Sequence, residues 1–577
     1  MNRKNFIELI IGGGAVSAAP LFSFSTFVQT GKGEEKIRKG KDMLRADVVI
    51  AGGGLGGCAS ALAALRNNLN VIMTEETDWI GGQLTQQGVP PDEHPWIEFT
   101  GSTQLYRDFR NAIRDYYKRN YPLTDEAKQN PLLNPGDGAV SRLCHEPKVA
   151  LAVLNDMIAS YISSKKLVLL LNHKAIHAKV RGDAVQSIVV KDTLNNATKE
   201  LRAPYFVDAT ELGDLLPLTR AEFITGTESK KETGELHAPG KSNPNNVQAF
   251  TVCFAMDYIP GENHTIEKPV DYEFWKNYVP DLTPPWPGKL LALHYSNPST
   301  LNPKILGFNP EGEPTGDTLN LWNYRKIINR KNFKKGTYPG DITIVNWPQN
   351  DYMLGNLIGA SEEDFNKHVQ AAKQLSLSLL YWLQTEVPRP DGGKGWPGIR
   401  LRKDIMGTKD GLAKYPYVRE SRRIKAVFTI LEEHVGKDNR AIVAKDNKQE
   451  AAYFYDSVGI GYYHIDLHPT CDKINYIDFP SLRFQIPLGA LIPIRLKNLL
   501  SANKNIGTTH ITNGCYRLHP VEWSIGEAVG SVISYALQKN VTPYEIRAKN
   551  DLLKEFQEFI RSEGIETEWP NEDELKR

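Results

Sequence analysis

The chain has 577 residues, and its 69 lysines and arginines nearly balance its 68 aspartates and glutamates, leaving a formal net charge of +1. This length allows two or more domains, and the balanced charge gives no indication of a nucleic-acid partner. The five cysteines are scattered without a C-x-x-C pair, which argues against a metal site and a redox-active disulfide. Beyond the N-terminal segment no apolar run approaches the length of a membrane span, so we expect none in the mature chain.

Residues 1–30 are typical of an export signal. A short basic start, Arg3-Lys4, precedes an apolar stretch that ends near Val28. Arg3-Lys4-x-Phe6 resembles a twin-arginine signal, with lysine in place of the second arginine. We therefore expect a periplasmic or secreted protein with a solvated linker over residues 31–45. A disordered or membrane-tethering N-terminus is the alternative, and the protein is cytoplasmic if the export interpretation fails.

Residues 46–75 predict a buried strand, a glycine-rich turn, a helix and a second strand. The motif G-x-G-x-x-G falls on Gly52, Gly54 and Gly57. These glycines permit a tight turn, close approach of the backbone to a pyrophosphate, and close packing of the helix on the strand. Glu75 ends the second strand and can accept hydrogen bonds from ribose hydroxyls. The segment predicts a dinucleotide site; a glycine-rich turn without a ligand is the alternative.

Three later segments extend this prediction. Gly81-Gly82 lets the backbone come close to an extended cofactor, although an ordinary glycine turn would give the same sequence pattern. An apolar strand ends in Asp208-Ala209-Thr210, where small residues leave room for the adenosine half. Near the C-terminus, residues 498–503 predict a strand and residues 520–538 a helix rich in small residues, among them Gly526.

Taken together, these motifs resemble bacterial FAD-dependent oxidoreductases of the glutathione-reductase-like fold. The resemblance covers about residues 46–540 and includes the segments 346–351 and 419–424. It implies FAD, redox chemistry and a C-terminal helix whose N-terminus points at the flavin, but it implies no substrate. Asn503 departs from the family, which usually carries glycine there. The expected cofactor contacts are Gly52, Gly54, Gly57, Glu75, Gly82, Asp208, Thr210, Asn503 and Gly526.

The fold class that follows is α/β: a discontinuous Rossmann-like FAD-binding domain with an inserted α+β substrate domain. The expected parts are 46–225 and 476–540 for the FAD-binding domain, 226–475 for the substrate domain and 541–577 for a C-terminal helix and tail. The inserted region is rich in tryptophan; these side chains could line a pocket, but most are expected to be core anchors. Within it, residues 361–382 predict a helix capped by Ser361.

Removing a hydride and a proton from an alcohol or amine requires a base, most often histidine. Alternation places Tyr462, His464 and Asp466 on one face of a predicted strand and Tyr463 on the other, although the favoured interpretation of His464 is a structural histidine. His510 and His519 bracket the loop before the C-terminal helix, near the expected flavin. The candidate catalytic residues are His510, His519, His464 and Tyr516.

Arginine side chains suit carboxylates and phosphates, and Arg419 and Arg422 could bind an acidic substrate or the FAD pyrophosphate. A structural ion-pair network with Glu420 is the alternative. Trp347 and Asn350 belong to another family-like motif and complete the candidate substrate-binding set.

The leading interpretation is an FAD-dependent dehydrogenase or oxidase. It would transfer hydride from a C–H next to oxygen or nitrogen of a small polar molecule, such as a carbohydrate derivative, to flavin N5. The alternative is a flavin-dependent C=C reductase with Tyr516 as its acid. A non-catalytic binding protein with a vestigial flavin fold is a third interpretation. The sequence specifies neither the substrate nor the electron acceptor.

Overall fold

The computed structural model describes residues 42–312, 318–444 and 450–575, which belong to one compact unit. The export signal predicted for residues 1–30 lies outside the described residues. The predicted linker over 31–45 extends too far, because β1 (Asp42–Arg45) is already a strand that pairs in parallel with β7 (Thr198–Arg202). Among the described helices, none combines the length and apolarity needed to cross a membrane.

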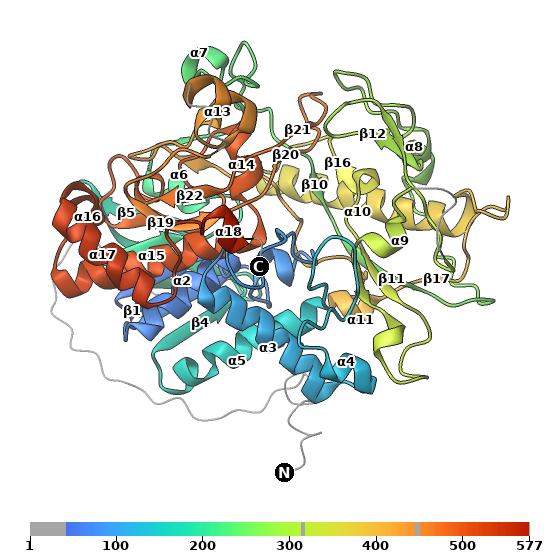
Figure 1. The fold of residues 1–577 in the computed structure, drawn as a ribbon, viewed down its shortest axis with the longest axis horizontal. Coiled ribbons are helices and arrows are strands. Elements are labelled where there is room, and N and C mark those ends of the chain that lie inside the picture. Colours follow the sequence, from blue (N-terminus) through green and yellow to red (C-terminus); the bar gives the residue numbers. More distant parts are fainter. Residues whose placement is uncertain (1–41, 313–317, 445–449, 576–577) are drawn as a thin grey trace. The chain divides into compact units, whose positions relative to one another are not determined.

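A five-stranded parallel sheet forms the centre of the cofactor domain (Figure 1). Its strands, in spatial order, are β23 (Leu499–Ser501), β8 (Tyr205–Asp208), β2 (Val48–Ala51), β3 (Val71–Glu75) and β4 (Leu167–Leu171). Strands from both ends of the chain pair directly, since β23 lies beside β8. The predicted discontinuous α/β fold is therefore confirmed. Four of the strands are buried along their whole length, as expected for a parallel sheet covered on both faces.

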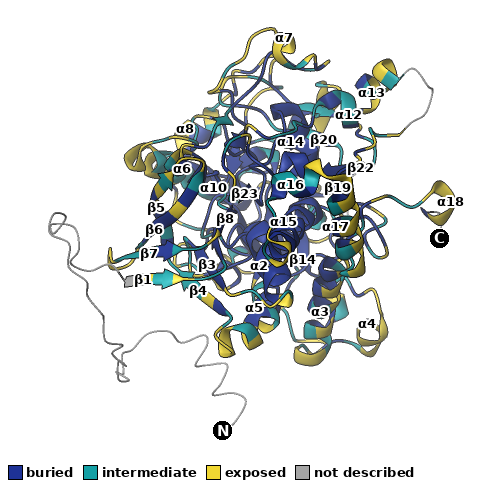
Figure 2. Cartoon of the chain, turned by 90° about the vertical axis from the view of Figure 1, so that its left-hand side faces the viewer, coloured by how far each residue is buried: buried dark blue, intermediate teal, exposed yellow. Residues whose placement is uncertain are grey.

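The two faces of this sheet pack against different layers. Val48 and Ile50 share a core with three helices: α2 (Leu55–Arg66), α5 (Pro147–Ser163) and α15 (His519–Lys539). Val49 and Ala51 point the other way, into a core shared with a second sheet. That sheet has the order β1-β7-β6-β5, with β6 at Ala184–Asp192 and β5 at His173–Arg181. Figure 2 shows α2 and α15 buried at the centre of the molecule.

Glycines allow α2 and α15 to approach each other and the sheet. A Cβ atom on Gly526 would lie 2.1 Å from the carbonyl oxygen of Gly56, and one on Gly56 would lie 1.6 Å from that of Ala502. The predicted strand and helix near the C-terminus are confirmed as β23 and α15. The loop expected before α15 is instead a helix, α14 (His510–Tyr516), because Thr509 and Thr512 form a capping box at its start.

The inserted region has its own antiparallel sheet and its own hydrophobic core, drawn mainly from Ala249 to Val418. The sheet has the order β14 (Lys326–Ile328), β15 (Ile342–Val345), β11 (Phe254–Tyr258), β17 (Ile399–Leu401). The long helix α10 (Glu362–Thr385) packs here, as predicted. The core also contains the tryptophans at positions 275, 286, 322, 347, 382 and 396, which confirms that they anchor it. The boundaries at residues 225 and 475 stay predictions.

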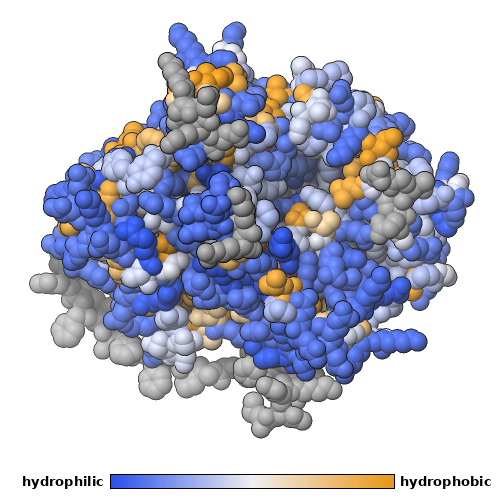
Figure 3. Space-filling view, viewed as in Figure 1, coloured by the Kyte–Doolittle hydropathy of each residue, from blue (hydrophilic) through white to orange (hydrophobic). Residues whose placement is uncertain are grey.

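Short antiparallel pairs and helices complete the described chain. The pairs are β9 (Phe223–Ile224) with β18 (Arg423–Ile424), β10 (Phe250–Thr251) with β16 (Asp351–Tyr352), β12 (His294–Ser296) with β13 (Pro303–Ile305), β19 (Ser457–Gly461) with β22 (Phe484–Pro487), and β20 (Ile465–Leu467) with β21 (Ile477–Phe479). The remaining α-helices are α3 (Gln104–Asn120), α4 (Asp125–Gln129), α6 (Leu215–Thr219), α7 (Lys230–Thr233), α8 (Tyr272–Asn277), α9 (Leu321–Tyr324), α11 (Lys403–Met406), α12 (Glu432–Val435), α13 (Lys437–Ala444), α16 (Pro543–Ala548), α17 (Asn550–Ser562) and α18 (Glu572–Leu575). The face in Figure 3 is mostly hydrophilic, with hydrophobic side chains scattered in small groups.

The predicted cap of α10 gives a local test of stability. Ser361 Oγ accepts a hydrogen bond of 3.1 Å from the N–H of Asp364. Replacing Ser361 by alanine leaves this N–H without its acceptor, so amide exchange in the first turn of α10 is expected to become about fivefold faster. Hydrogen-exchange mass spectrometry measures this directly. Ser562→Ala, which removes a serine at the C-terminal end of α17, should leave amide exchange in α10 unchanged. If both substitutions accelerated exchange in α10 equally, the assignment of the cap would be contradicted.

Candidate functional site

The three predicted cofactor segments meet at one edge of the parallel sheet, where its strands end. Gly52, with φ at +98°, lies so close to the end of β8 that a Cβ atom on it would be 2.1 Å from the oxygen of Ala209. The N–H of Ala502 donates to the carbonyl of Asp208 at 2.9 Å. Asn503 Nδ2 donates to the carbonyl of Ala209 at 3.3 Å. Asn503, the departure from the family pattern, thus ties the two strand ends together.

A small cavity of about 30 Å³ opens beside this junction, lined by Gly52, Gly54, Glu75 and Thr210. Glu75 accepts a hydrogen bond of 3.0 Å from the N–H of Gly53, and burial raises its pKa to about 8. The carboxyl group is thus positioned at the end of β3, where the motif predicted a ribose contact.

The other predicted cofactor residues shape the junction without lining this cavity. Gly57 and Gly526 allow close packing of α2. Gly82 lies against Gly54: a Cβ atom added to Gly82 would be 2.9 Å from the Cα atom of Gly54. The carboxylate of Asp208 accepts hydrogen bonds from the N–H groups of Thr210 and Leu215. Burial raises the pKa of Asp208 to about 7.

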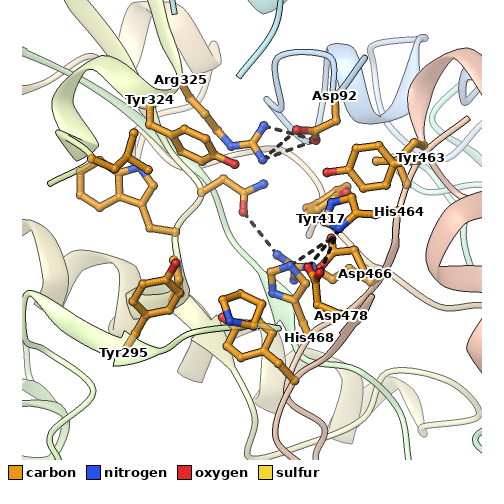
Figure 4. A pocket seen from close by; sticks show the side chains of 18 of the residues that line it. Asp92, Tyr295, Tyr324, Arg325, Tyr417, Tyr463, His464, Asp466, His468 and Asp478 are labelled. Carbon is orange, nitrogen blue, oxygen red and sulfur yellow. Dashed lines mark hydrogen bonds and ion pairs between the residues drawn. The ribbon is translucent and has the colours of Figure 1, made fainter. Parts of the chain in front are cut away.

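A second cavity of about 180 Å³, here called the polar cavity, lies between the inserted region and the segments around β20 and β21. Aromatic side chains form much of its wall: Tyr295, Tyr324, Trp347, Tyr417, Tyr463 and Tyr476. Leu518, the residue before α15, also lines it. Figure 4 shows Arg325 and Asp92 facing each other on one side, with His464, Asp466, His468 and Asp478 gathered on another.

Three arginines reach the polar cavity, and each is paired with a carboxylate. Arg325 lies 3.2 Å from Asp92, Arg419 lies 3.0 Å from Asp351, and Arg517 lies 2.9 Å from Asp466. All three guanidinium groups are buried. Because a buried charge is stable only when it is paired, these contacts hold the arginines in fixed positions.

The paired arginines still carry unused hydrogen-bond donors. The Nε atoms of Arg325, Arg419 and Arg517 are buried and have no acceptor in the described part of the chain. The same holds for Asn346 Nδ2 and Trp347 Nε1, which belong to residues of the same wall. Buried donors are nearly always satisfied, so these atoms mark side chains in the wall of the polar cavity whose hydrogen-bonding capacity the described residues leave unused.

Two histidines face the polar cavity, each with a carboxylate partner. His468 Nδ1 lies 2.6 Å from Asp351 Oδ2, and its Nε2 lies 3.6 Å from Asp466 Oδ2. Burial opposes ionisation of Asp351, but Arg419 and His468 outweigh it and lower its pKa. This carboxylate is therefore an acceptor for the Nδ1–H of His468. A neutral ring held in this way carries its lone pair on Nε2.

His464, a predicted catalytic residue, lines the cavity with its Nδ1 3.1 Å from Asp478. Burial would lower the pKa of His464, but hydrogen bonding to Asp478 outweighs it and the pKa is raised. The predicted alternation fails for Tyr463, which lines the cavity together with His464. The reason is that β20 begins only at Ile465, so neither residue is in a strand.

The structure does not bring the other predicted catalytic residues to the polar cavity. His510 Nδ1 lies 2.7 Å from buried Glu420, and the Tyr516 hydroxyl donates to the carbonyl of Gln485 at 2.7 Å. His519 Nδ1 accepts from the N–H of Asp92 at 3.1 Å. Burial lowers the pKa of His519 to about 4, so it is neutral with its proton on Nε2.

Of the predicted substrate-binding residues, Arg419 and Trp347 line the polar cavity, whereas Arg422 and Asn350 do not. Arg422 donates to the carbonyl of Leu212 at 2.7 Å. Asn350 is buried, and its Oδ1 accepts a hydrogen bond of 2.9 Å from the backbone N–H of Trp347. Both side chains therefore support the site rather than face it. In the described part of the chain, no group of histidine, cysteine, aspartate or glutamate side chains is arranged to hold a metal ion.

Asp92, Arg325, Tyr417, Asp478 and His468 were not selected from the sequence. Asp92 and Arg325 are separated by 233 residues, so no local spacing connects them. The available signal for His468 was its place at the end of the run of residues 462–468, which is rich in tyrosine, histidine and aspartate.

A family model described as FAD dependent oxidoreductase matches residues 47–560. A search of the curated proteins finds no match. Among solved structures, glycerol-3-phosphate dehydrogenase from Bacillus halodurans, complexed with FAD, is 15% identical, with a TM-score of 0.22 over 37% of this chain and 40% of that one. L-Proline dehydrogenase from P. horikoshii is 16% identical, with a TM-score of 0.17 over 32% and 24%. Anhydrotetracycline hydroxylase from Streptomyces rimosus is 10% identical, with a TM-score of 0.33 over 90% and 67%. The chain spans less than half of the first two structures.

Proposed function

The chain belongs to the FAD dependent oxidoreductase family, and we propose that it oxidises a small polar molecule held in the polar cavity. The bond broken is a C–H next to oxygen or nitrogen, as in an alcohol or amine. FAD is the cofactor, and it supplies the chemistry of hydride acceptance when bound. The residues of this chain bind and orient the substrate and remove the proton.

The residues at the sheet edge fit FAD. Gly52 and Gly54 leave no space for side chains where backbone must approach a pyrophosphate. Gln83 Oε1 and both amide atoms of Gln87 are buried in the segment after Gly82 and have no partner among the described residues. Unused polar atoms of this kind are consistent with an extended polar cofactor along that segment.

The polar cavity is the observation that carries the proposal. Its donors suit the oxygens of a polyhydroxylated or carboxylated molecule, and its aromatic walls suit the C–H faces of a sugar ring. Arg517 and Leu518 belong to this wall and immediately precede α15. In the resembled family, the N-terminus of this helix points at the flavin. A substrate in the cavity would therefore lie next to the expected hydride acceptor.

We assign the base to His468. Its Nδ1–H is held by Asp351, so the lone pair of Nε2 is available to accept the hydroxyl or ammonium proton of the substrate. Asp351 and Asp466 lie 2.6 and 3.6 Å from the two ring nitrogens and can each accept a hydrogen bond from the imidazolium that results. Arg419 keeps Asp351 ionised throughout, because the two side chains are 3.0 Å apart.

Anaerobic bleaching of the purified yellow protein tests this function. We expect one class among sugars, uronic acids, amines and hydroxy acids to bleach the flavin without oxygen, which would also identify the substrate class. A panel that leaves the flavin oxidised throughout would contradict the proposal.

A flavin-dependent C=C reductase is the second candidate, and Tyr463 favours it. This tyrosine lines the polar cavity, and burial holds its pKa well above the usual value, so its hydroxyl carries the proton that such a reductase must give to the substrate carbon. Tyr516, the acid predicted from sequence, has its hydroxyl bound to Gln485 instead. Reoxidation of dithionite-reduced protein by an unsaturated compound, without oxygen, would select this candidate.

We also propose that the protein is exported, because residues 1–30 combine a basic start with an apolar stretch. Fractionation of the native host followed by N-terminal sequencing tests this. A shortened chain in the periplasm or medium supports export, and an intact N-terminus in the cytoplasm contradicts it.

A further inference from the structure

A buried charge cluster lies at the N-terminus of α2. Lys504 follows β23 and is 1% exposed, with its Nζ 2.5 Å from Glu211 Oε2 and 3.8 Å from Glu522 Oε2. Glu522, from the first turn of α15, accepts hydrogen bonds from the N–H of Gly56 at 3.3 Å and from Gln83 Nε2 at 2.6 Å. Strand ends and helix starts that are far apart in the sequence thus place two carboxyl groups around one lysine.

This cluster occupies the place that the glycine motif gives to a pyrophosphate. A Cβ atom on Gly54 would lie 2.9 Å from Glu211 Oε1 and 3.6 Å from Glu522 Oε1, so both carboxyl groups flank the same turn. Glu211 Oε1 is buried and has no hydrogen-bond partner among the described residues, and its side chain is 10% exposed. Lys504 and the two carboxyl groups therefore surround the turn at which the glycine motif predicts the pyrophosphate.

The charges of the cluster oppose a doubly negative ligand. With both glutamates ionised, Lys504 leaves the cluster with a net charge of −1, and the FAD pyrophosphate would add two more negative charges. Like charges at such short range in a buried place are strongly unfavourable. Protonation of one glutamate removes a repulsive charge and supplies a hydrogen-bond donor.

We propose that Glu522 takes up a proton from solvent when FAD binds, so that its carboxylic acid and Lys504 together receive the pyrophosphate at the N-terminus of α2. The N–H of Gly56, which donates to Glu522 in this structure, would then be free to donate to the pyrophosphate. Binding of each FAD is coupled to the uptake of one proton.

The surroundings of Glu522 make this protonation accessible near neutral pH. Burial raises the pKa of Glu522 to about 7; Lys504 opposes the increase and Glu211 adds to it. Cys58 from α2 and Glu75 from β3 face the same region, and burial raises the pKa of both. FAD binding brings more negative charge and raises the pKa of Glu522 further, so the proton is taken up above about pH 7.

Dilution of the holoenzyme at graded pH, with the fluorescence of released FAD as the signal, gives the dissociation constant Kd. We expect Kd to be constant below about pH 7 and to increase about tenfold per pH unit above it. In Glu522→Gln, a neutral donor replaces the acid, and the tenfold increase of Kd per pH unit should be lost. A wild-type Kd without this slope, or a variant that keeps it, would overturn the proposal.

Glu527→Gln is the matched control. Glu527 lies on the same helix, is buried, and has its pKa raised by burial to about 7, but it contacts Trp523 and Arg66 instead of the cluster. This variant should keep the wild-type slope. If Glu522→Gln does not fold, calorimetry of FAD binding to the wild-type protein at pH 8, in buffers of different ionisation enthalpy, counts the protons directly. One proton is expected, and none would overturn the proposal.

Discussion

Replacement of His468 by asparagine is expected to lower kcat for flavin reduction by about 10²- to 10⁴-fold. Asparagine has no lone pair of comparable basicity at the position of Nε2, so the substrate proton has no acceptor. His468 is held by Asp351 at 2.6 Å, and this contact orients the ring toward the cavity. Anaerobic stopped-flow reduction by the bleaching substrate measures the effect, and FAD content should be unchanged.

His464→Asn is the control for this prediction. The side chain of His464 is 41% exposed, so its pairing with Asp478 is weakened by solvent. We expect less than about a tenfold decrease in kcat for this variant. A larger loss for His464 than for His468 would move the base to the residue selected from sequence. Equal, small losses would exclude both histidines as the base.

Replacement of Gly526 by alanine is expected to abolish FAD binding and to lower the free energy of unfolding by about 3 kcal/mol. The added methyl group would lie 2.1 Å from the backbone oxygen of Gly56, which cannot move as a side chain could. Relief of this clash must separate α15 from α2, and it thereby moves the turn at Gly54. Flavin absorbance after purification and urea denaturation measure the two effects.

Gly240→Ala is the matched control for Gly526→Ala. A Cβ atom on Gly240 meets no other atom within 4 Å, and the residue has no positive φ. This substitution should change the free energy of unfolding by less than about 0.5 kcal/mol and leave FAD bound. A yellow Gly526→Ala protein of wild-type stability would contradict the described packing of α2 and α15.

The cofactor side of the molecule could be predicted from sequence because its signals are local or belong to a shared motif. Gly52, Gly54 and Glu75 follow one another within a single strand–helix–strand unit. The glycines allow the backbone to turn and approach the cofactor, and Glu75 offers its carboxyl group to the ribose. The strand and helix near the C-terminus were recognisable by composition alone. Their pairing with β8 and α2 followed from the fold class.

The substrate side could not be predicted in the same way. The pair of Asp92 and Arg325 and that of Asp351 and His468 join distant segments, so their contact depends on tertiary packing. For His510, its place near α15 suggested a role in the reaction, and that role stays a prediction. Because Thr509 caps a helix there, the His510 side chain points at Glu420 instead.

The most direct test of the account follows the hydride itself. Once a bleaching substrate is known, it is deuterated at the carbon that carries the hydroxyl or amine and mixed with the oxidised protein without oxygen. Mass spectrometry of the product and absorbance of the flavin are then compared. We expect the loss of one deuterium from that carbon for each flavin bleached. A product that retains all its deuterium while the flavin is reduced would contradict it.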